Sequence, residues 1–401
     1  PLMLEVLEHA VAAAREIEAE SVFEFWRALY DAQDAWGKER GMPPLLGHLG
    51  TSLVERAVID AWCRGQRETF AGALRSGGLG VDLGALHPEL AGSQVADWLP
   101  EEPCEVIIAR HTVGLGDPLL PQDITDEDRA DDGLPQALSD AIDHYGLTHF
   151  KVKICGKLEV DIPRLIAIAK LLAEKVPGYR FTLDGNEQYH DLGTFREHWE
   201  AFGNEEALEE FLSPEHLIFV EQPLFRDMAL APELKEALSD WTGAPPMIID
   251  ESDAECDSLR RALALGYRGT SHKNCKGVFK GVANRCLLGW YRRERPEDGP
   301  WVMSGEDLAN VGPVALLNDL AAMAAMGIDD VERNGHHYFA GLSMYPEAVQ
   351  EQVVARHPDL YGASKDGWPT LRIENGRIAA DSVNAAGFGC GPGLDEDTLG
   401  G

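Results

Sequence analysis

Basic residues are scarce in this sequence. Its 401 residues include 35 lysines and arginines against 68 aspartates and glutamates, which gives a formal net charge of −33. An acidic field of this size repels the phosphates of nucleic acids and anionic membrane surfaces, so we expect neither as a partner. Part of the excess lies in runs such as 205–210, which are typical of solvated helix faces and favour solubility.

Long apolar runs and paired cysteines are missing as well. No run approaches the roughly eighteen residues that a membrane helix needs, and no signal-peptide pattern opens the sequence. The seven cysteines are scattered, odd in number and without CxxC spacing. This distribution argues against a disulfide framework, and we expect a cytoplasmic protein. A hydrophobic content of 44% is ordinary for a globular chain, which can bury a large core at this length.

The opening of the sequence is helical in pattern. Apolar residues recur at helical spacing through residues 1–36, and a Pro-Pro pair then indicates a loop. Thr51 or Ser52 is expected to cap a second helix, with Glu55 completing a capping box. We expect residues 1–100 to form a smaller, largely helical capping domain.

From about residue 105 the rhythm changes to short Val- and Ile-rich runs separated by longer helical patterns. Each interval fits one strand, one helix and two short loops, as crossovers between parallel strands require. Eight such units over roughly 230 residues predict a (β/α)8 TIM-type barrel at 101–345, with a C-terminal segment, 346–401, that returns to the cap. A doubly wound open sheet is the alternative, but its glycine-rich dinucleotide fingerprint is missing. The expected strands are 106–108, 150–154, 181–183, 217–220, 247–249, 269–273, 301–303 and 328–331.

The stretch 149–154, His-Phe-Lys-Val-Lys-Ile, alternates apolar and cationic side chains. This period of two predicts a strand with two different faces. Lys151 and Lys153 then point to the face that the barrel encloses. Two ammonium groups about 7 Å apart on one face resist burial, so anionic groups are expected opposite them.

Three carboxylates end three successive expected strands: Asp184, Glu221 and Asp250. Taken singly, each is most simply an N-cap of the following helix. Three in consecutive units are harder to explain in this way, because the carboxyl ends of barrel strands converge at one mouth, where active sites lie. An all-oxygen ligand set favours a hard cation, Mg²⁺ first, with Mn²⁺ as a substitute.

The next expected strand ends in Ser271-His272-Lys273-Asn274. Strand parity places Ser271 and Lys273 inward and His272 outward. Lys273 thereby joins the same rim as the acids. Lys276 is its rival, although we expect it at the start of the following helix.

In this order the motifs Lys-x-Lys, Asp-x-Asn, Glu-Gln-Pro, Asp-Glu-Ser and Lys resemble the enolase superfamily, in particular the muconate-lactonizing type of the mandelate racemase/muconate lactonizing enzyme family. The mandelate-racemase type would carry an Asp on the sixth strand and a His on the seventh. This sequence has Lys273 and Ser-Gly-Glu-Asp (304–307) there. The resemblance covers about 105–340. Relatives usually begin with a β-meander whose loop closes the site, so we expect that segment to lie outside the printed sequence or the lid to be built otherwise.

The resemblance implies Mg²⁺-dependent abstraction of the proton α to a carboxylate through an enediolate. We expect a racemase or epimerase acting on a small carboxylate, and a homo-oligomer. An acid-sugar dehydratase or a cycloisomerase is the alternative, and an inactive binding relative is a second one. The implied metal ligands are Asp184, Glu221 and Asp250; the implied acid/base residues are Lys153 and Lys273, with Lys151 beside the substrate carboxylate. Groups expected around the metal or the substrate are Asn186, Glu251, Ser271, Asn274, Glu306 and His336.

Overall fold

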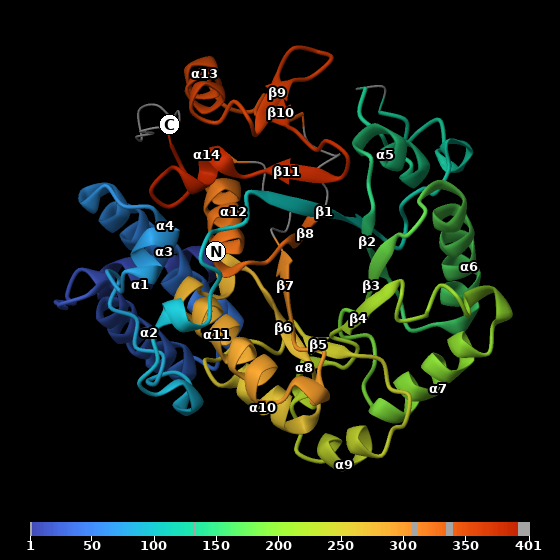
Figure 1. Cartoon of the computed structure of the whole chain (residues 1–401), viewed down its shortest axis with the longest axis horizontal. Coiled ribbons are helices and arrows are strands. Elements are labelled where there is room, and N and C mark those ends of the chain that lie inside the picture. The colour runs from blue at the N-terminus through green and yellow to red at the C-terminus, as the bar shows by residue number, and fades with distance from the viewer. Residues whose placement is uncertain (1, 131–132, 307–311, 334–339, 392–401) are drawn as a thin grey trace.

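Eight parallel strands close into a barrel at the centre of the molecule (Figure 1). The computed structural model describes residues 2–130, 133–306, 312–333 and 340–391. Each strand pairs with the next in chain order, and β1 also pairs with β8, which closes the ring. The predicted (β/α)8 class is confirmed, and the open sheet is excluded. The strands are β1 (Val106–Val113), β2 (His149–Lys153), β3 (Arg180–Asp184), β4 (Leu217–Glu221), β5 (Met247–Ile249), β6 (Gly269–His272), β7 (Val302–Glu306) and β8 (Asp330–Arg333).

Helices on the outside of the barrel form the crossovers between strands (Figure 1). α12 is buried along nearly its whole length, and α11 along most of it. Among the described residues, no helix has both the length and the apolar character that crossing a bilayer requires. The helices of the barrel are α5 (Leu138–Tyr145), α6 (Leu158–Lys175), α7 (Leu192–Gly203), α8 (Arg226–Ala229), α9 (Leu234–Ser239), α10 (Ser258–Leu265), α11 (Val278–Glu294) and α12 (Ala315–Met326).

The N-terminal part is largely helical, but its boundaries differ from the expected ones. The expected opening helix is divided in two between residues 14 and 22. Ser21 caps the second of these helices by accepting a hydrogen bond from the Glu24 amide. The predicted helix start at Thr51 or Ser52 is wrong, because Pro44 already occupies the first turn of that helix, where its missing N–H costs nothing. The helices here are α1 (Leu2–Ala14), α2 (Val22–Glu39), α3 (Pro44–Gln66) and α4 (Phe70–Arg75).

The N-terminal helices pack on the barrel at α11. The rings of Phe23 and Trp26 lie 5.6 and 5.5 Å from the ring of Phe279. Glu55 does not close a capping box on α3, as the sequence pattern suggested. It lies inside that helix, and its carboxylate accepts hydrogen bonds from the amides of Val278 and Phe279 at the start of α11.

The C-terminal segment contacts both the barrel and the N-terminal helices. β11 pairs with β1 in an antiparallel register, and the ring of Phe388 lies 4.6 Å from that of Phe70 on α4. Figure 1 shows β9, β10 and α13 above the barrel strands. The elements are α13 (Glu347–Arg356), β9 (Tyr361–Ala363), β10 (Pro369–Leu371), β11 (Arg377–Ala379) and α14 (Asp381–Asn384).

Candidate active site

Strand register brings predicted site residues to the same level of the barrel wall. Lys153 at the end of β2 lies opposite Asp184 at the end of β3, and Asp184 lies opposite Glu221 at the end of β4. Asp250 follows β5 directly. Side chains alternate along a strand, so residues in register on neighbouring strands share a face. The three carboxylates are buried almost completely and lie at the carboxyl end of the barrel.

Lys151 lies at the centre of this cluster and is 1% exposed. Its Nζ is 2.9 Å from carboxylate oxygens of Asp184 and Glu221, 3.1 Å from Glu306 and 3.3 Å from Glu332. Burial alone would lower the pKa of Lys151, but the surrounding carboxylates outweigh burial and hold the pKa well above its usual range. Lys151 therefore stays charged and holds together acids that would otherwise repel one another.

Lys153 reaches the edge of the cluster. Its Nζ lies 2.7 Å from Asp184 Oδ2 and 2.6 Å from the side-chain oxygen of Asn186. The Asn186 amide donates to Asp184 Oδ1, and its side-chain nitrogen donates to Glu251 Oε1 over 3.3 Å. Asn186 adopts a φ of +38°, in a region that asparagine tolerates better than most residues with a side chain. With 19% of its side chain exposed, Lys153 remains accessible to a ligand.

Lys273 approaches from the other side of the ring. Its Nζ lies 2.6 Å from Asp250 Oδ2 and 2.8 Å from Glu306, and its side chain is 14% exposed. Ser271 Oγ donates to Asp250 Oδ1 over 2.6 Å, so both residues point inward as strand parity predicted. His272 points outward, where its ring lies against α11 at Gly281.

Lys276 lies in a 3-10 turn, η5 (Asn274–Lys276), and the prediction that it begins the next helix is wrong. Gly277, with a φ of +110°, ends the turn in a conformation that residues with a side chain avoid, and α11 starts only after it. Lys276 Nζ lies 2.6 Å from Asp250 Oδ1. Burial raises the pKa of Asp250, but Lys273 and Lys276 outweigh burial and lower it.

Gln222 lies beside the cluster and was not among the predicted site residues, although it follows the strand-end glutamate in the Glu-Gln-Pro motif. Its side-chain oxygen accepts hydrogen bonds from the Asp250 amide (2.8 Å) and the Ser252 amide (3.2 Å). Its side-chain nitrogen donates to Ser252 Oγ over 2.8 Å. Gln222 also has a positive φ, +33°. This residue fixes the loop that carries Asp250.

Two further carboxylates come from β7 and β8. Glu306, which the sequence placed only in the surroundings, is 1% exposed and contacts both Lys151 and Lys273. Glu332 was not predicted. Its Oε1 accepts a hydrogen bond from Thr112 Oγ1, and its other oxygen faces Lys151. The expected eighth strand ended before Glu332, which left its inward orientation unnoticed.

The acids differ in how tightly they hold a proton. Burial and the charge of Glu306 raise the pKa of Glu221 well above its usual range. Burial raises the pKa of Glu251 to about 7, and the charges of Asp250 and Asp184 add to the effect. Glu221 and Glu251 therefore tend to hold protons unless a cation takes their place.

The donor set fits a divalent metal ion. Oxygens of Glu221, Asp250 and Glu306 lie within 4.8 Å of one another, and oxygen donors suit Mg²⁺. Oε2 of Glu251 is buried and has no hydrogen-bond partner among the described residues. In the cluster, six carboxylates accompany four lysines, so the fully ionised cluster carries two negative charges, which one divalent cation would balance. The carboxylates are Asp184, Glu221, Asp250, Glu251, Glu306 and Glu332, and the lysines are Lys151, Lys153, Lys273 and Lys276.

Three further predicted residues have different outcomes. His336 and its neighbour His337 fall outside the described residues. The Asn274 side-chain oxygen lies 3.0 Å from the ring of His272, on the outer side of β6. Asp184, an implied metal ligand, lies outside the trio of closely spaced acids and bonds to two lysines instead.

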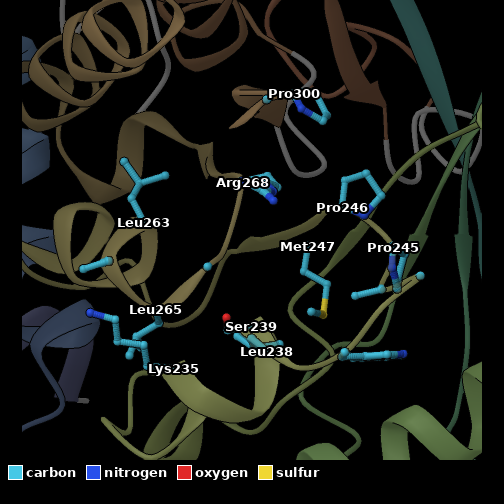
Figure 2. Close-up of a pocket in the computed structure, with 16 residues that line it drawn as sticks. Lys235, Leu238, Ser239, Pro245, Pro246, Met247, Leu263, Leu265, Arg268 and Pro300 are labelled. Atoms are coloured by element: carbon cyan, nitrogen blue, oxygen red, sulfur yellow. The ribbon is translucent and has the colours of Figure 1, made fainter. Parts of the chain in front are cut away.

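A pocket of about 570 Å³ opens at the opposite end of the barrel. Figure 2 shows Met247, where β5 begins, with Pro245 and Pro246 beside it, and Arg268 and Pro300, which precede β6 and β7. These are the amino ends of the strands, whereas active sites of such barrels form at the carboxyl ends. The pocket is separate from the carboxylate cluster.

Solved structures share this fold at low sequence identity. A mandelate racemase/muconate lactonizing enzyme from Bordetella bronchiseptica RB50 is 15% identical, with a TM-score of 0.60, over 99% of this chain and 85% of that one. The 3,6-anhydro-D-galactonate cycloisomerase from Zobellia galactanivorans is 12% identical, with a TM-score of 0.57, over 99% and 86%. An enolase from Pseudomonas fluorescens Pf0-1, with bound magnesium, potassium and tartrate, is 15% identical, with a TM-score of 0.55, over 98% and 79%.

These structural neighbours are a mandelate racemase/muconate lactonizing enzyme, a cycloisomerase and an enolase, and the barrel fold that the sequence motifs implied is confirmed. No protein-family model and no curated protein matches the sequence. The likeness therefore lies in the fold, and the chemistry must be argued from the side chains.

Proposed function

We propose that this chain is an enolase-superfamily enzyme that uses Mg²⁺ to remove the proton α to the carboxylate of a small acid, and that it is a racemase or epimerase. The observation that carries the proposal is the placement of two lysines. β2 and β6 are four positions apart in a ring of eight strands, so Lys153 and Lys273 approach the mouth from opposite sides. Each bonds to a different carboxylate, Asp184 or Asp250.

A substrate carboxylate held over the acid cluster would place its α-carbon between the two lysines. One lysine then removes the proton from one face of that carbon, and the other returns a proton to the opposite face. Bound Mg²⁺ supplies positive charge beside the substrate carboxylate, which makes the neighbouring C–H more acidic. Glu221, Asp250 and Glu306 would hold it, with Asp184 or Glu251 beside them.

Lys273 must lose its own proton before it can accept another. Burial lowers its pKa, but Asp250 and Glu306 outweigh burial and hold the pKa well above its usual range. When these carboxylates serve as metal ligands, their charge no longer favours the protonated lysine, and burial then lowers the pKa. Proton acceptance by Lys273 is therefore coupled to metal binding.

Lys151 has a different part in this proposal. Four carboxylates enclose it, and its pKa is held high, so it does not exchange protons at neutral pH. Its fixed charge keeps the acids close enough to share one ion. It also adds positive potential beneath the position where negative charge develops on the substrate.

A dehydratase or cycloisomerase is the second candidate, and the cycloisomerase among the structural neighbours favours it. In that case one lysine removes the proton and the other only stabilises charge while a leaving group departs or a ring opens. The same side chains serve both reactions, so the number of faces that exchange protons separates them.

The test is a screen for α-proton exchange in deuterated water. The protein with Mg²⁺ would be incubated with acid sugars, N-acyl amino acids, dipeptides and lactones, and the α-position would be followed by NMR. We expect exchange into both stereoisomers of the true substrate, abolished by a chelator. Exchange that survives excess chelator, or none with any carboxylate, would overturn the proposal.

A further inference from the structure

Helix α11 has no capping side chain at its own N-cap position. Gly277 occupies the N-cap position and offers no side chain, although the first amides of a helix need acceptors. Glu55 of α3 supplies them from a point 223 residues earlier in the chain: Oε2 accepts from the Val278 amide over 2.9 Å, and Oε1 from the Phe279 amide over 2.7 Å. A carboxylate there also meets the positive end of the helix dipole. Glu55 is 1% exposed, so water does not replace these bonds.

The turn that Glu55 caps continues from the loop that carries two lysines of the site. Lys273 precedes η5, Lys276 ends it, and both bond to Asp250. α3 packs directly against η5. Any shift in the start of α11 therefore moves both ammonium groups relative to the Asp250 carboxylate.

A second anchor joins the first turn of α11 to the loop after β5. Lys280 Nζ lies 3.2 Å from Asp253 Oδ1 and also donates to the main-chain oxygen of that residue. Thr270 on β6 donates to Asp253 Oδ2 over 2.9 Å. These three side chains are almost completely buried. The same helical turn thus fixes the loop that carries Asp250 and the loop that carries Lys273.

We propose that Glu55 is a positioning residue which, through the first turn of α11, sets the placement of Lys273 and Asp250 and so couples the N-terminal helices to the assembly of the site. This proposal rests on the proposed function only where it concerns the reaction that the site catalyses. A carboxylate that merely docked the helices would affect the stability of the fold and leave the metal site unchanged.

The experiment compares the wild-type protein with Glu55→Gln at pH 8. Burial raises the pKa of Glu55 to about 7, against the effect of the two amide donors, so the wild-type carboxylate is ionised at that pH. The glutamine can accept from one amide, but its own N–H groups face the other. We expect amide hydrogen exchange at 273–280 to quicken by about tenfold. Mg²⁺ affinity, measured by calorimetry, should weaken roughly tenfold, as when groups that orient metal ligands are lost.

Gln33→Met is the matched control. Gln33 is a fully buried polar residue of α2 whose side chain donates to the main-chain oxygen of Val6 on α1. Its loss should lower the melting temperature through the N-terminal helices alone. Mg²⁺ affinity and exchange at 273–280 should match those of the wild-type protein. The same loss of metal affinity in this control would reduce Glu55 to a structural residue.

The other possible outcomes also test whether Glu55 positions the site. If Glu55→Gln folds and leaves both Mg²⁺ affinity and exchange at 273–280 unchanged, Glu55 does not position the site. If it fails to fold, Glu55→Asp, which keeps the charge but withdraws the oxygens by one methylene, takes its place with the same two readouts. If the wild-type protein binds no Mg²⁺, the proposed function fails, whereas exchange at 273–280 still decides whether Glu55 holds the loop.

Discussion

Lys276 bonds to Asp250 at two points: its Nζ lies 2.6 Å from Oδ1 and 2.8 Å from the main-chain oxygen. Lys273 takes the other carboxylate oxygen at 2.6 Å. Asp250 thus meets a lysine at each oxygen, whereas Oε2 of the neighbouring Glu251 is buried without a hydrogen-bond partner in the described part of the chain. The two acids after β5 are therefore held differently, Asp250 by fixed bonds and Glu251 with one oxygen available.

Replacing these two acids in turn identifies the third metal ligand. We expect Asp250→Asn to weaken Mg²⁺ binding by about tenfold or more, because one of its carboxylate oxygens lies within 4.8 Å of ligand atoms of Glu221 and Glu306. Glu251→Gln should be milder. Calorimetric titration measures both, with the melting temperature as a check on folding. The reverse order of effects would make Glu251 the ligand and Asp250 a partner of the lysines.

Activity should depend on a divalent ion. Chelation is expected to abolish turnover, and Mg²⁺ or Mn²⁺ to restore it, since the acid cluster has two more carboxylates than lysines and, once fully ionised, needs a cation to balance them. Glu221→Gln should weaken metal binding while the barrel stays folded, because the amide keeps the shape of the side chain and loses its charge. Glu209→Gln, at an exposed position, makes the same charge change and should have no effect. Full turnover in excess chelator would contradict this dependence on a divalent ion.

Metal affinity should rise with pH. In the metal-free protein, burial raises the pKa of Glu251 to about 7 and that of Glu221 well above its usual range. These acids therefore hold protons that they must release before they can bind the metal ion. Between pH of about 6 and 8 we therefore expect tighter binding and release of protons on titration, counted by calorimetry in two buffers of different ionisation enthalpy. Glu251→Gln should release fewer protons. A pH-independent affinity would contradict this account.

The same shifts set the sign of the pH dependence of folding. An acid whose pKa is higher in the folded state than in the unfolded chain keeps its proton on folding at intermediate pH. The free energy of unfolding of the metal-free protein should then fall as pH rises from the ordinary glutamate value of 4.5 toward 7, through Glu251. Added Mg²⁺ should restore the lost stability at pH 8, which thermal unfolding with and without the ion would detect.

The alternation of side chains and the spacing of the apolar runs were enough to predict the barrel and most of the cluster. The alternation around Lys151 and the acids at successive strand ends depend on strand parity and barrel closure alone, and the structure has both. Glu332 escaped notice because a weak apolar run did not indicate that β8 extends to it. The roles of Gln222 and Glu55 depend on which loops and helices meet in three dimensions, and no local pattern carries that information.

The last prediction is that Lys153 and Lys273 are separable. They come from opposite sides of the ring and bond to different carboxylates, so each faces one side of an α-carbon held above the cluster. In deuterated water each enantiomer of a true substrate should exchange its α-proton through its own lysine. Lys153→Ala is then expected to silence exchange from one enantiomer and spare the other, with Lys273→Ala doing the reverse.

NMR of the two enantiomers, incubated separately with each variant, measures this directly. Lys175→Ala is the control, because Lys175 is a surface lysine whose Nζ pairs with Asp143 on the outside of the barrel, away from the mouth. It should leave exchange from both enantiomers unchanged. Two-base racemisation would be contradicted if either site variant abolished exchange from both enantiomers, or if only one enantiomer ever exchanged in the wild-type protein. One lysine would then act as the base while the other stabilises charge, and dehydration or cycloisomerisation would be the reaction that this arrangement of lysines and carboxylates supports.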